Sequence, residues 1–220
     1  MPANTGAPIA VARQVRAARS WPARLHTLLG LALGVFALYH GVQNYPAVER
    51  QEAWVDRAIA GSLGFGFGML VLAALGVHAV LGLASWQRQR RALAKAGAER
   101  DWGLDFQLLT GGLLLAFIVF HVLQLWPSGA GPHASVREPY ARLWQQLGHP
   151  PWLALYVAGI TAVAFHAGHG LSRLLARAGL ALPQTAARVL GGVLGLLLLL
   201  IFLQIVTRFA LGEALIPAFT

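Results

Sequence analysis

The chain contains no cysteine among its 220 residues. This absence excludes disulfide bonds, thiolate metal sites, covalently attached c-type haem and a cysteine nucleophile. Charged side chains are also scarce: they make up 11% of the chain, whereas soluble domains carry about a quarter. Only 8 residues are acidic, and the mean hydropathy is +0.60. Because so few charges cannot coat a water-soluble globule, the composition excludes a disordered chain, a coiled coil and a nucleic-acid-binding module.

Long apolar runs occupy much of the sequence. A helix needs roughly 20 apolar residues to cross a bilayer. Five segments reach this length, at 26–45, 63–86, 107–126, 151–172 and 189–211, and no Asp or Glu lies inside them. Since lipid requires the backbone hydrogen bonds to be made within each segment, these spans should be helical. The sequence therefore predicts an all-α integral membrane protein built as a bundle of five transmembrane helices.

The basic residues are distributed unevenly around these spans. Most of the 17 Lys and Arg residues flank the side that includes the N-terminus. Positive charge favours the cytoplasmic side of a membrane, so we expect the N-terminus in the cytoplasm and the C-terminus outside, in a bacterial inner membrane. Topology thus explains the excess charge without a nucleic-acid partner. No small-x-small cleavage site follows the first span, so we expect residues 1–20 to be a retained cytoplasmic lead and residues 21–220 the membrane domain.

Glycines recur at helical spacing in two regions, at Gly61, Gly64 and Gly68 and at Gly191, Gly192 and Gly195. Small residues let transmembrane helices approach closely, so we expect helix–helix contacts there. Making room for a flat macrocycle is an alternative role that the spacing alone does not demonstrate.

Four of the 8 histidines lie one in each of the first four spans: His40, His78, His121 and His166. An ionisable residue inside the membrane is a functional candidate by default, although a neutral His bonded to a nearby carbonyl stays open for each. From the helical rise, His40 and His121 lie roughly 21 Å from the inner ends of their spans. His78 and His166 lie only roughly 12 Å and 9 Å from theirs. The depths predict an outer pair, His40 with His121, and an inner pair, His78 with His166.

Two pairs at two depths match the axial ligation of two stacked b-type haems. Low-spin iron takes one imidazole nitrogen on each face of the ring, supplied by facing helices. The other ring N–H can bond to a helix carbonyl, so burial costs little. A proton relay would favour carboxylates, and zinc would need three or four ligands at one depth. We therefore predict that these four histidines bind two haems b and that the chain carries electrons.

Short motifs around these histidines resemble those of the five-helix, two-haem cytochrome b subunits of succinate dehydrogenase and fumarate reductase. The motifs are RLHTLLG (24–30), YH (39–40), VHAVLG (77–82), VFHV (119–122) and FHAGHGL (165–171). The resemblance covers residues 24–211 and implies the same pairing of histidines around an outer and an inner haem. It also implies two partners on the cytoplasmic face, a flavoprotein subunit that interconverts succinate and fumarate and an iron–sulfur subunit. The electrons pass to or from a membrane quinone, usually menaquinone, and the anchor binds neither dicarboxylate nor flavin.

One departure from this family bears on the direction of the reaction. Some of its quinol:fumarate reductases carry a Glu in the fourth helix as part of a proton path, but Val163, Ala164 and Phe165 include no carboxylate. The sequence therefore favours succinate oxidation, with fumarate reduction as the alternative. A haem b anchor of a hydrogenase or a formate dehydrogenase also remains open. A haem-free transporter or assembly protein has little support, because no span has a central Pro-Gly break or an embedded carboxylate.

Further polar residues lie near the ends of the spans. Ser20, Arg24 and His26 are expected at the inner interface, where they would meet a haem propionate, a quinone, the iron–sulfur partner or only the lipid headgroups. His169 shares a helix face with His166 and is the rival ligand in the fourth span.

The outer ends of the spans carry candidates for a quinone pocket: Gln43, Asn44, Tyr45, Gln124 and Trp126. An aromatic belt explains Tyr45 and Trp126 equally well. His133 and His149 are expected to be solvated in the outer loop.

Overall fold

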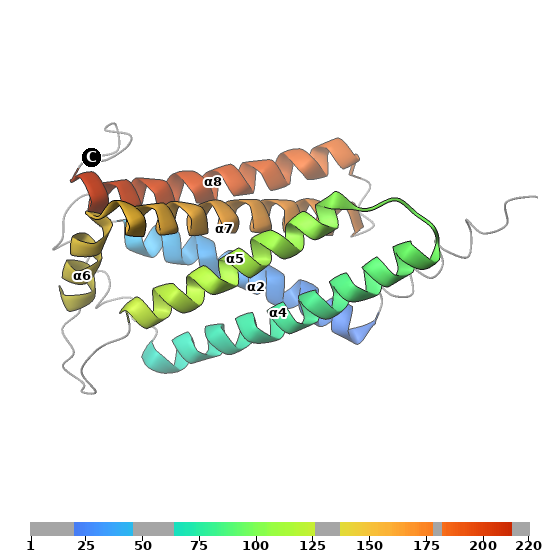
Figure 1. The fold of residues 1–220 in the computed structure, drawn as a ribbon, viewed down its shortest axis with the longest axis horizontal. Helices are drawn as coiled ribbons and strands as arrows, with labels where there is room; N and C mark the ends of the chain where they lie inside the picture. The colour runs from blue at the N-terminus through green and yellow to red at the C-terminus, as the bar shows by residue number, and fades with distance from the viewer. Residues whose placement is uncertain (1–19, 46–63, 126–136, 178–181, 213–220) are drawn as a thin grey trace, which may run out of the picture.

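The computed structural model describes residues 20–45, 64–125, 137–177 and 182–212, and these ranges contain helices and turns but no strand. The helices are α2 (Trp21–Asn44), α4 (Gly64–Lys95), α5 (Trp102–Leu125), α6 (Arg137–Leu147), α7 (Pro150–Arg177) and α8 (Gln184–Leu211). Five of them, all except α6, are long and apolar enough to cross a membrane. They lie side by side in an elongated bundle (Figure 1). The predicted all-α fold with five candidate membrane-spanning helices is confirmed.

Local sequence determines where several helices begin and end. The side chain of Asp101 accepts the backbone N–H of Leu104 at 3.1 Å, which caps the start of α5. Pro150 begins α7, at a position where a missing N–H costs nothing. Gly212 ends α8 with a φ of 73°, in the left-handed region that glycine adopts without strain. The α4 helix continues past its apolar run to Lys95, since residues 87–95 are mostly good helix formers.

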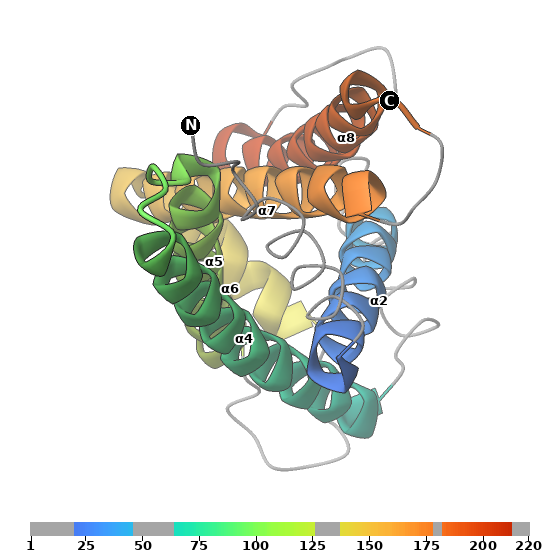
Figure 2. The same cartoon turned by 90° about the vertical axis from the view of Figure 1, so that its right-hand side faces the viewer.

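Four helices, α2, α4, α5 and α7, surround a common centre when the bundle is seen end-on, and α8 packs outside α7 (Figure 2). Each of these four helices carries one of the four membrane histidines. The seam between α7 and α8 is tight at two glycines. A Cβ added at Gly191 would overlap the carbonyl oxygen of Gly168, and one added at Gly195 would lie 2.8 Å from that of Ala164. The predicted glycine contact is therefore confirmed at these two residues.

The other predicted glycine contacts have different outcomes. An added Cβ at Gly192 or at Gly68 would meet nothing within 4 Å, so the expectation of a helix contact was wrong there. Gly61 lies outside the described residues, and the surroundings of Gly64 are not described.

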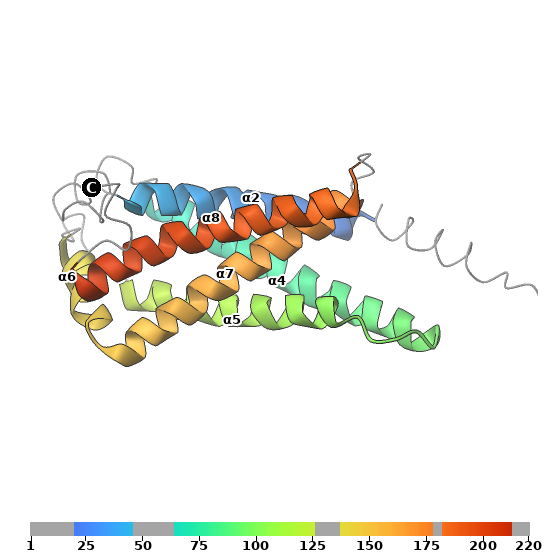
Figure 3. The same ribbon diagram turned by 90° about the horizontal axis from the view of Figure 1, so that it is seen from above.

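The short helix α6 lies across one end of the bundle (Figures 1 and 3). Hydropathy did not predict a helix there. Leu147, at its last turn, is 1% exposed and belongs to a core cluster with Tyr156 and Phe209. We call this end of the bundle the α6 end. The opposite end, where α4 ends and α5 begins, is called the Asp105 end.

Candidate functional site

The four membrane histidines lie in two pairs along the bundle. At the α6 end, the ring centroids of His40 and His121 are 6.2 Å apart. Towards the Asp105 end, those of His78 and His166 are 6.3 Å apart. In both pairs the two ring planes are 83° apart. The structure thus brings together the same partners that helix depth predicts, while their role as ligands stays a prediction.

These separations suit two imidazoles that share one metal atom. With a metal–nitrogen bond of about 2 Å and a ring centre about 1.2 Å behind the nitrogen, two trans imidazoles have centroids about 6.4 Å apart. The observed 6.2 and 6.3 Å are close to this value. The described part of the chain contains no group of three or more His, Asp or Glu side chains at metal-binding spacing. The donor set therefore fits the two axial positions of a haem, once in each pair.

Hydrogen bonds towards the Asp105 end indicate which ring nitrogen of His78 is free to bind a metal and which groups face His166. Nδ1 of His78 lies 3.2 Å from the carbonyl oxygen of His26, which can only accept, so Nδ1 carries the proton. Nδ1 of His166 lies 3.4 Å from the hydroxyl of Thr110, whose own proton goes to the carbonyl of Phe106 at 2.9 Å. The threonine oxygen can therefore accept from His166. In His78 this leaves the lone pair of Nε2 for a metal, whereas the Gln107 amide nitrogen also lies near both ring nitrogens of His166.

Gln107 adds a third group beside His166. Its Nε2 donates to the His166 carbonyl at 3.1 Å and lies 3.3 and 3.4 Å from the two ring nitrogens. Its buried Oε1 has no hydrogen-bond partner in the described part of the chain. An acceptor without a donor therefore lies next to this pair.

The two histidines at the α6 end have different partners. Nδ1 of His121 lies 3.0 Å from the hydroxyl of Tyr156, which donates its own proton to Oε1 of Gln124 at 2.9 Å. That hydroxyl therefore accepts from His121. His40 instead lies next to an amide: Nδ2 of Asn44 donates to the His40 carbonyl at 2.7 Å and is 3.3 Å from Nδ1.

Two glycines on neighbouring helices make room for the histidines towards the Asp105 end. A Cβ added at Gly30 of α2 would lie 3.0 Å from Cε1 of His78, and one added at Gly111 of α5 would lie 2.8 Å from Cε1 of His166. On the same helices, Gly34 and Gly112 would meet nothing within 4 Å. Sequence reasoning missed both positions. Gly30 ends one of the motifs that carry the family resemblance, but no sequence signal indicates which side chain it faces.

The interface candidate His26 and the rival ligand His169 both lie towards the Asp105 end. The ring of His26 stacks on His78, with centroids 4.2 Å apart and planes 12° apart. His169 lies on α7 against Gly103, where an added Cβ would be 3.4 Å from its Cε1. The structure therefore places His166, and not His169, opposite His78. Of the other interface candidates, Ser20 and Arg24 are exposed at the start of α2.

The quinone candidates gather at the α6 end, where some already have partners. Asn44 and Gln124 are bonded beside the histidine pair, and Tyr45 packs on the core cluster. Gln43 is half-buried, whereas Trp126 lies outside the described residues. Of the loop histidines, His149 is exposed before α7 and His133 also lies outside the described residues.

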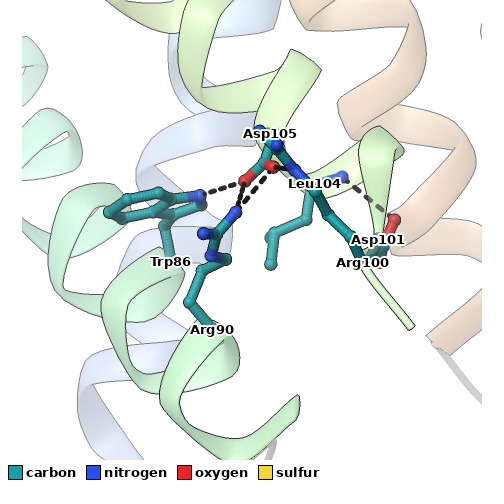
Figure 4. A network of polar contacts seen from close by, with 6 residues as sticks. All are labelled: Trp86, Arg90, Arg100, Asp101, Leu104 and Asp105. Atoms are coloured by element: carbon teal, nitrogen blue, oxygen red, sulfur yellow. Dashed lines mark hydrogen bonds and ion pairs between the residues drawn. The ribbon is translucent and has the colours of Figure 1, made fainter. Parts of the chain in front are cut away.

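A charged network fastens the opposite end of the bundle (Figure 4). The Asp105 carboxylate accepts from Nε1 of Trp86 at 2.9 Å, from Nη1 of Arg90 at 2.8 Å and from Nε of Arg100 at 2.5 Å. It thereby ties the last turns of α4 to the start of α5. The span boundaries expected from hydropathy left this carboxylate outside the third span, so sequence reasoning missed its role.

These features define the protein as a multi-pass α-helical membrane protein with two candidate bis-histidine sites inside its bundle. The chain is similar to the succinate dehydrogenase cytochrome b558 subunit of Bacillus subtilis (strain 168), with 26% identity over 171 residues, 76% of this chain and 83% of the relative. This similarity confirms the predicted resemblance to the cytochrome b membrane anchors of succinate dehydrogenase. No family model and no solved structure matches the chain.

Proposed function

We propose that the chain is the membrane anchor and electron-transfer subunit of a succinate dehydrogenase. In this proposal His40 and His121 hold one haem b, and His78 and His166 hold a second. The observation that carries the proposal is the pair of matching separations, 6.2 and 6.3 Å, in a chain similar to a succinate dehydrogenase cytochrome subunit. A bound haem supplies one-electron redox chemistry. The chain would supply two imidazole nitrogens to each haem and would keep the rings in a low-dielectric interior.

The distribution of charge supports an orientation for this electron path. Exposed basic residues gather at the Asp105 end, among them Arg88, Arg91 and Lys95. The positive-inside rule then places that end in the cytoplasm of a bacterial inner membrane, with the C-terminus outside. The flavoprotein and iron–sulfur partners would dock there. Electrons would enter near His78 and His166 and leave near His40 and His121, where we expect menaquinone to bind.

Fumarate reduction by the same anchor is the alternative direction. It would move the same electrons from quinol to the flavoprotein without a different histidine arrangement. Val163, Ala164 and Phe165 provide no carboxylate beside His166 for a transmembrane proton path. This absence favours succinate oxidation.

The test is a dithionite-reduced minus oxidised optical spectrum of the purified full chain, with haem quantified per polypeptide. We expect two b-type haems per chain, and the flavoprotein and iron–sulfur subunits in the material isolated from native membranes. Protein that contains no haem, despite expression with ample haem supply, would refute the proposal. If two haems are found together with hydrogenase or formate dehydrogenase subunits, the proposed electron path stands but the partner enzyme is a different one.

A further inference from the structure

Tyr156 occupies a constrained position next to His121. Its side chain is 3% exposed, and its ring packs edge-on against Phe117, with centroids 5.2 Å apart and planes 85° apart. Its hydroxyl lies between Nδ1 of His121 and Oε1 of Gln124, at 3.0 and 2.9 Å. Packing therefore leaves the phenol little freedom to choose other partners.

The chain of hydrogen bonds has a defined direction. Nε2 of Gln124 donates to Oε1 of Gln146, a residue of α6, so the oxygen of the Gln124 amide faces Tyr156. The tyrosine proton is therefore directed to Gln124, and the tyrosine oxygen is left to accept from Nδ1–H of His121. A second contact supports this arrangement, because Nη1 of Arg142 in α6 donates to the backbone carbonyl of Gln124 at 2.9 Å. The helix α6 thus holds Gln124, the acceptor of the Tyr156 hydroxyl, in place.

We propose that Tyr156 is a positioning residue that orients His121 and lowers the reduction potential of the haem at the α6 end. This inference rests on the proposed function. An acceptor at Nδ1–H makes the opposite nitrogen a stronger electron donor, and a stronger donor favours ferric over ferrous iron. The tyrosine also fixes the ring plane of His121, which lies 83° from that of His40.

The effect is confined to one ligand of one pair. On the opposite side, the nitrogen beside His40 belongs to the Asn44 amide, which already donates to a carbonyl and cannot accept a proton. Towards the Asp105 end, the acceptors are the His26 carbonyl and the Thr110 hydroxyl. Removing the Tyr156 hydroxyl should therefore leave the haem between His78 and His166 unchanged.

The experiment is an optical redox titration of the complete complex carrying Tyr156→Phe. A tenfold loss of preference for ferric iron corresponds to about 59 mV in a one-electron couple. We expect a rise of this order for one haem only, both haems being retained. The low-spin EPR signal of the same haem should move, because it reports the angle between the two imidazole planes. Gln124→Leu should give a smaller rise, since the phenol stays in place but loses its own acceptor.

Thr161→Val is the matched control, because it deletes a hydroxyl on the same helix that, among the described residues, donates to the Val157 carbonyl at 2.7 Å. It should change neither potential. Loss of only the α6-end haem in Tyr156→Phe would also support the positioning role. Two retained haems with unchanged potentials and EPR signals would overturn the inference and leave the proposed function intact. A wild-type chain without haem would overturn both.

Discussion

The two histidine pairs have almost the same separation but are held by different means. At the α6 end the rings pack among aromatic side chains: Phe36 stacks on His40 at 5.6 Å and Phe117 on His121 at 5.7 Å. Towards the Asp105 end, the rings also lie against backbone. His78 bonds to the carbonyl of His26, and both His78 and His166 lie against glycines.

This difference indicates how each pair would respond to mutation. Side chains hold the rings at the α6 end, so deleting a group should alter the pair without overcrowding it. Close backbone approach holds the other pair, so adding a single carbon should displace a ring. An added carbon would therefore press directly on a histidine ring of this pair, whereas at the α6 end, from Gly159, it would press on Phe117 instead.

The largest expected effect comes from removing one proposed ligand at the pair that lies against Gly30 and Gly111. His166→Leu should reduce the haem content from two per chain to one, because a single imidazole at His78 cannot supply both axial positions. Haem quantification and the reduced-minus-oxidised spectrum measure this directly. His169→Leu is the matched control, three residues further along α7, and should retain both haems. If His169→Leu loses a haem and His166→Leu does not, the pairing of His78 with His166 is wrong.

A smaller but more diagnostic effect is expected from Gly111→Ala. The new Cβ would lie 2.8 Å from Cε1 of His166, so the imidazole must move from its present position opposite His78. Changes next to a metal ligand typically weaken metal binding about 10–100-fold. We expect preferential loss of the haem at this pair on dilution or mild heating. Gly112→Ala is the matched control. It adds the same Cβ at the neighbouring residue, where nothing lies within 4 Å, and it raises the helix propensity equally. Equal haem retention in the two variants would show that backbone approach does not position His166.

Sequence determined the helices and the histidine pairs because both depend on position along a helix axis. Hydropathy locates each span, and the rise per residue then gives the depth of His40 or His166. The contacts around the rings depend on how each helix is rotated about its axis. Spans that are apolar on every side contain no amphipathic signal for that rotation. For this reason Gly30, Gly111 and Tyr156 were not predicted.

The helix α6 and the Asp105 network were missed for a different reason. Both lie where the chain leaves the apolar spans, and hydropathy is uninformative there. Residues 137–147 alternate polar and apolar residues at helical spacing, so a search for short amphipathic helices would have found α6. Asp105 carried a weaker signal, as one of three carboxylates, with Glu99 and Asp101, beside a basic segment. Its pairing with Trp86 requires the packing of α4 against α5.

A substitution where α7 packs against α8 should affect both histidine pairs equally. In Gly191→Ala the added Cβ would overlap the Gly168 carbonyl oxygen, an immovable backbone atom. Overpacking of this kind costs about 1–3 kcal/mol. We expect a lower thermal midpoint in detergent, with both haems lost together, because α7 carries His166 and α8 packs Phe202 near His40. Gly192→Ala, in open space, should match the wild type. If Gly191→Ala lost one haem before the other, the contact between α7 and α8 would not stabilise both histidine pairs equally.

The smallest expected effect concerns the charged network. Asp105→Asn removes the negative charge that attracts Arg90 and Arg100, while its amide oxygen still accepts from Trp86. Because the side chains of the two arginines are 41 and 52% exposed, solvent and salt screen the lost attraction. The thermal midpoint should fall by less than in Gly191→Ala, and added salt should reduce the difference from the wild type. Asp101→Asn, which keeps an oxygen for the α5 cap and loses only a 3.9 Å contact to Arg173, should have less effect still. If Asp105→Asn instead released a haem, the network would be positioning His78 or His166, and backbone approach alone would not explain that end of the bundle.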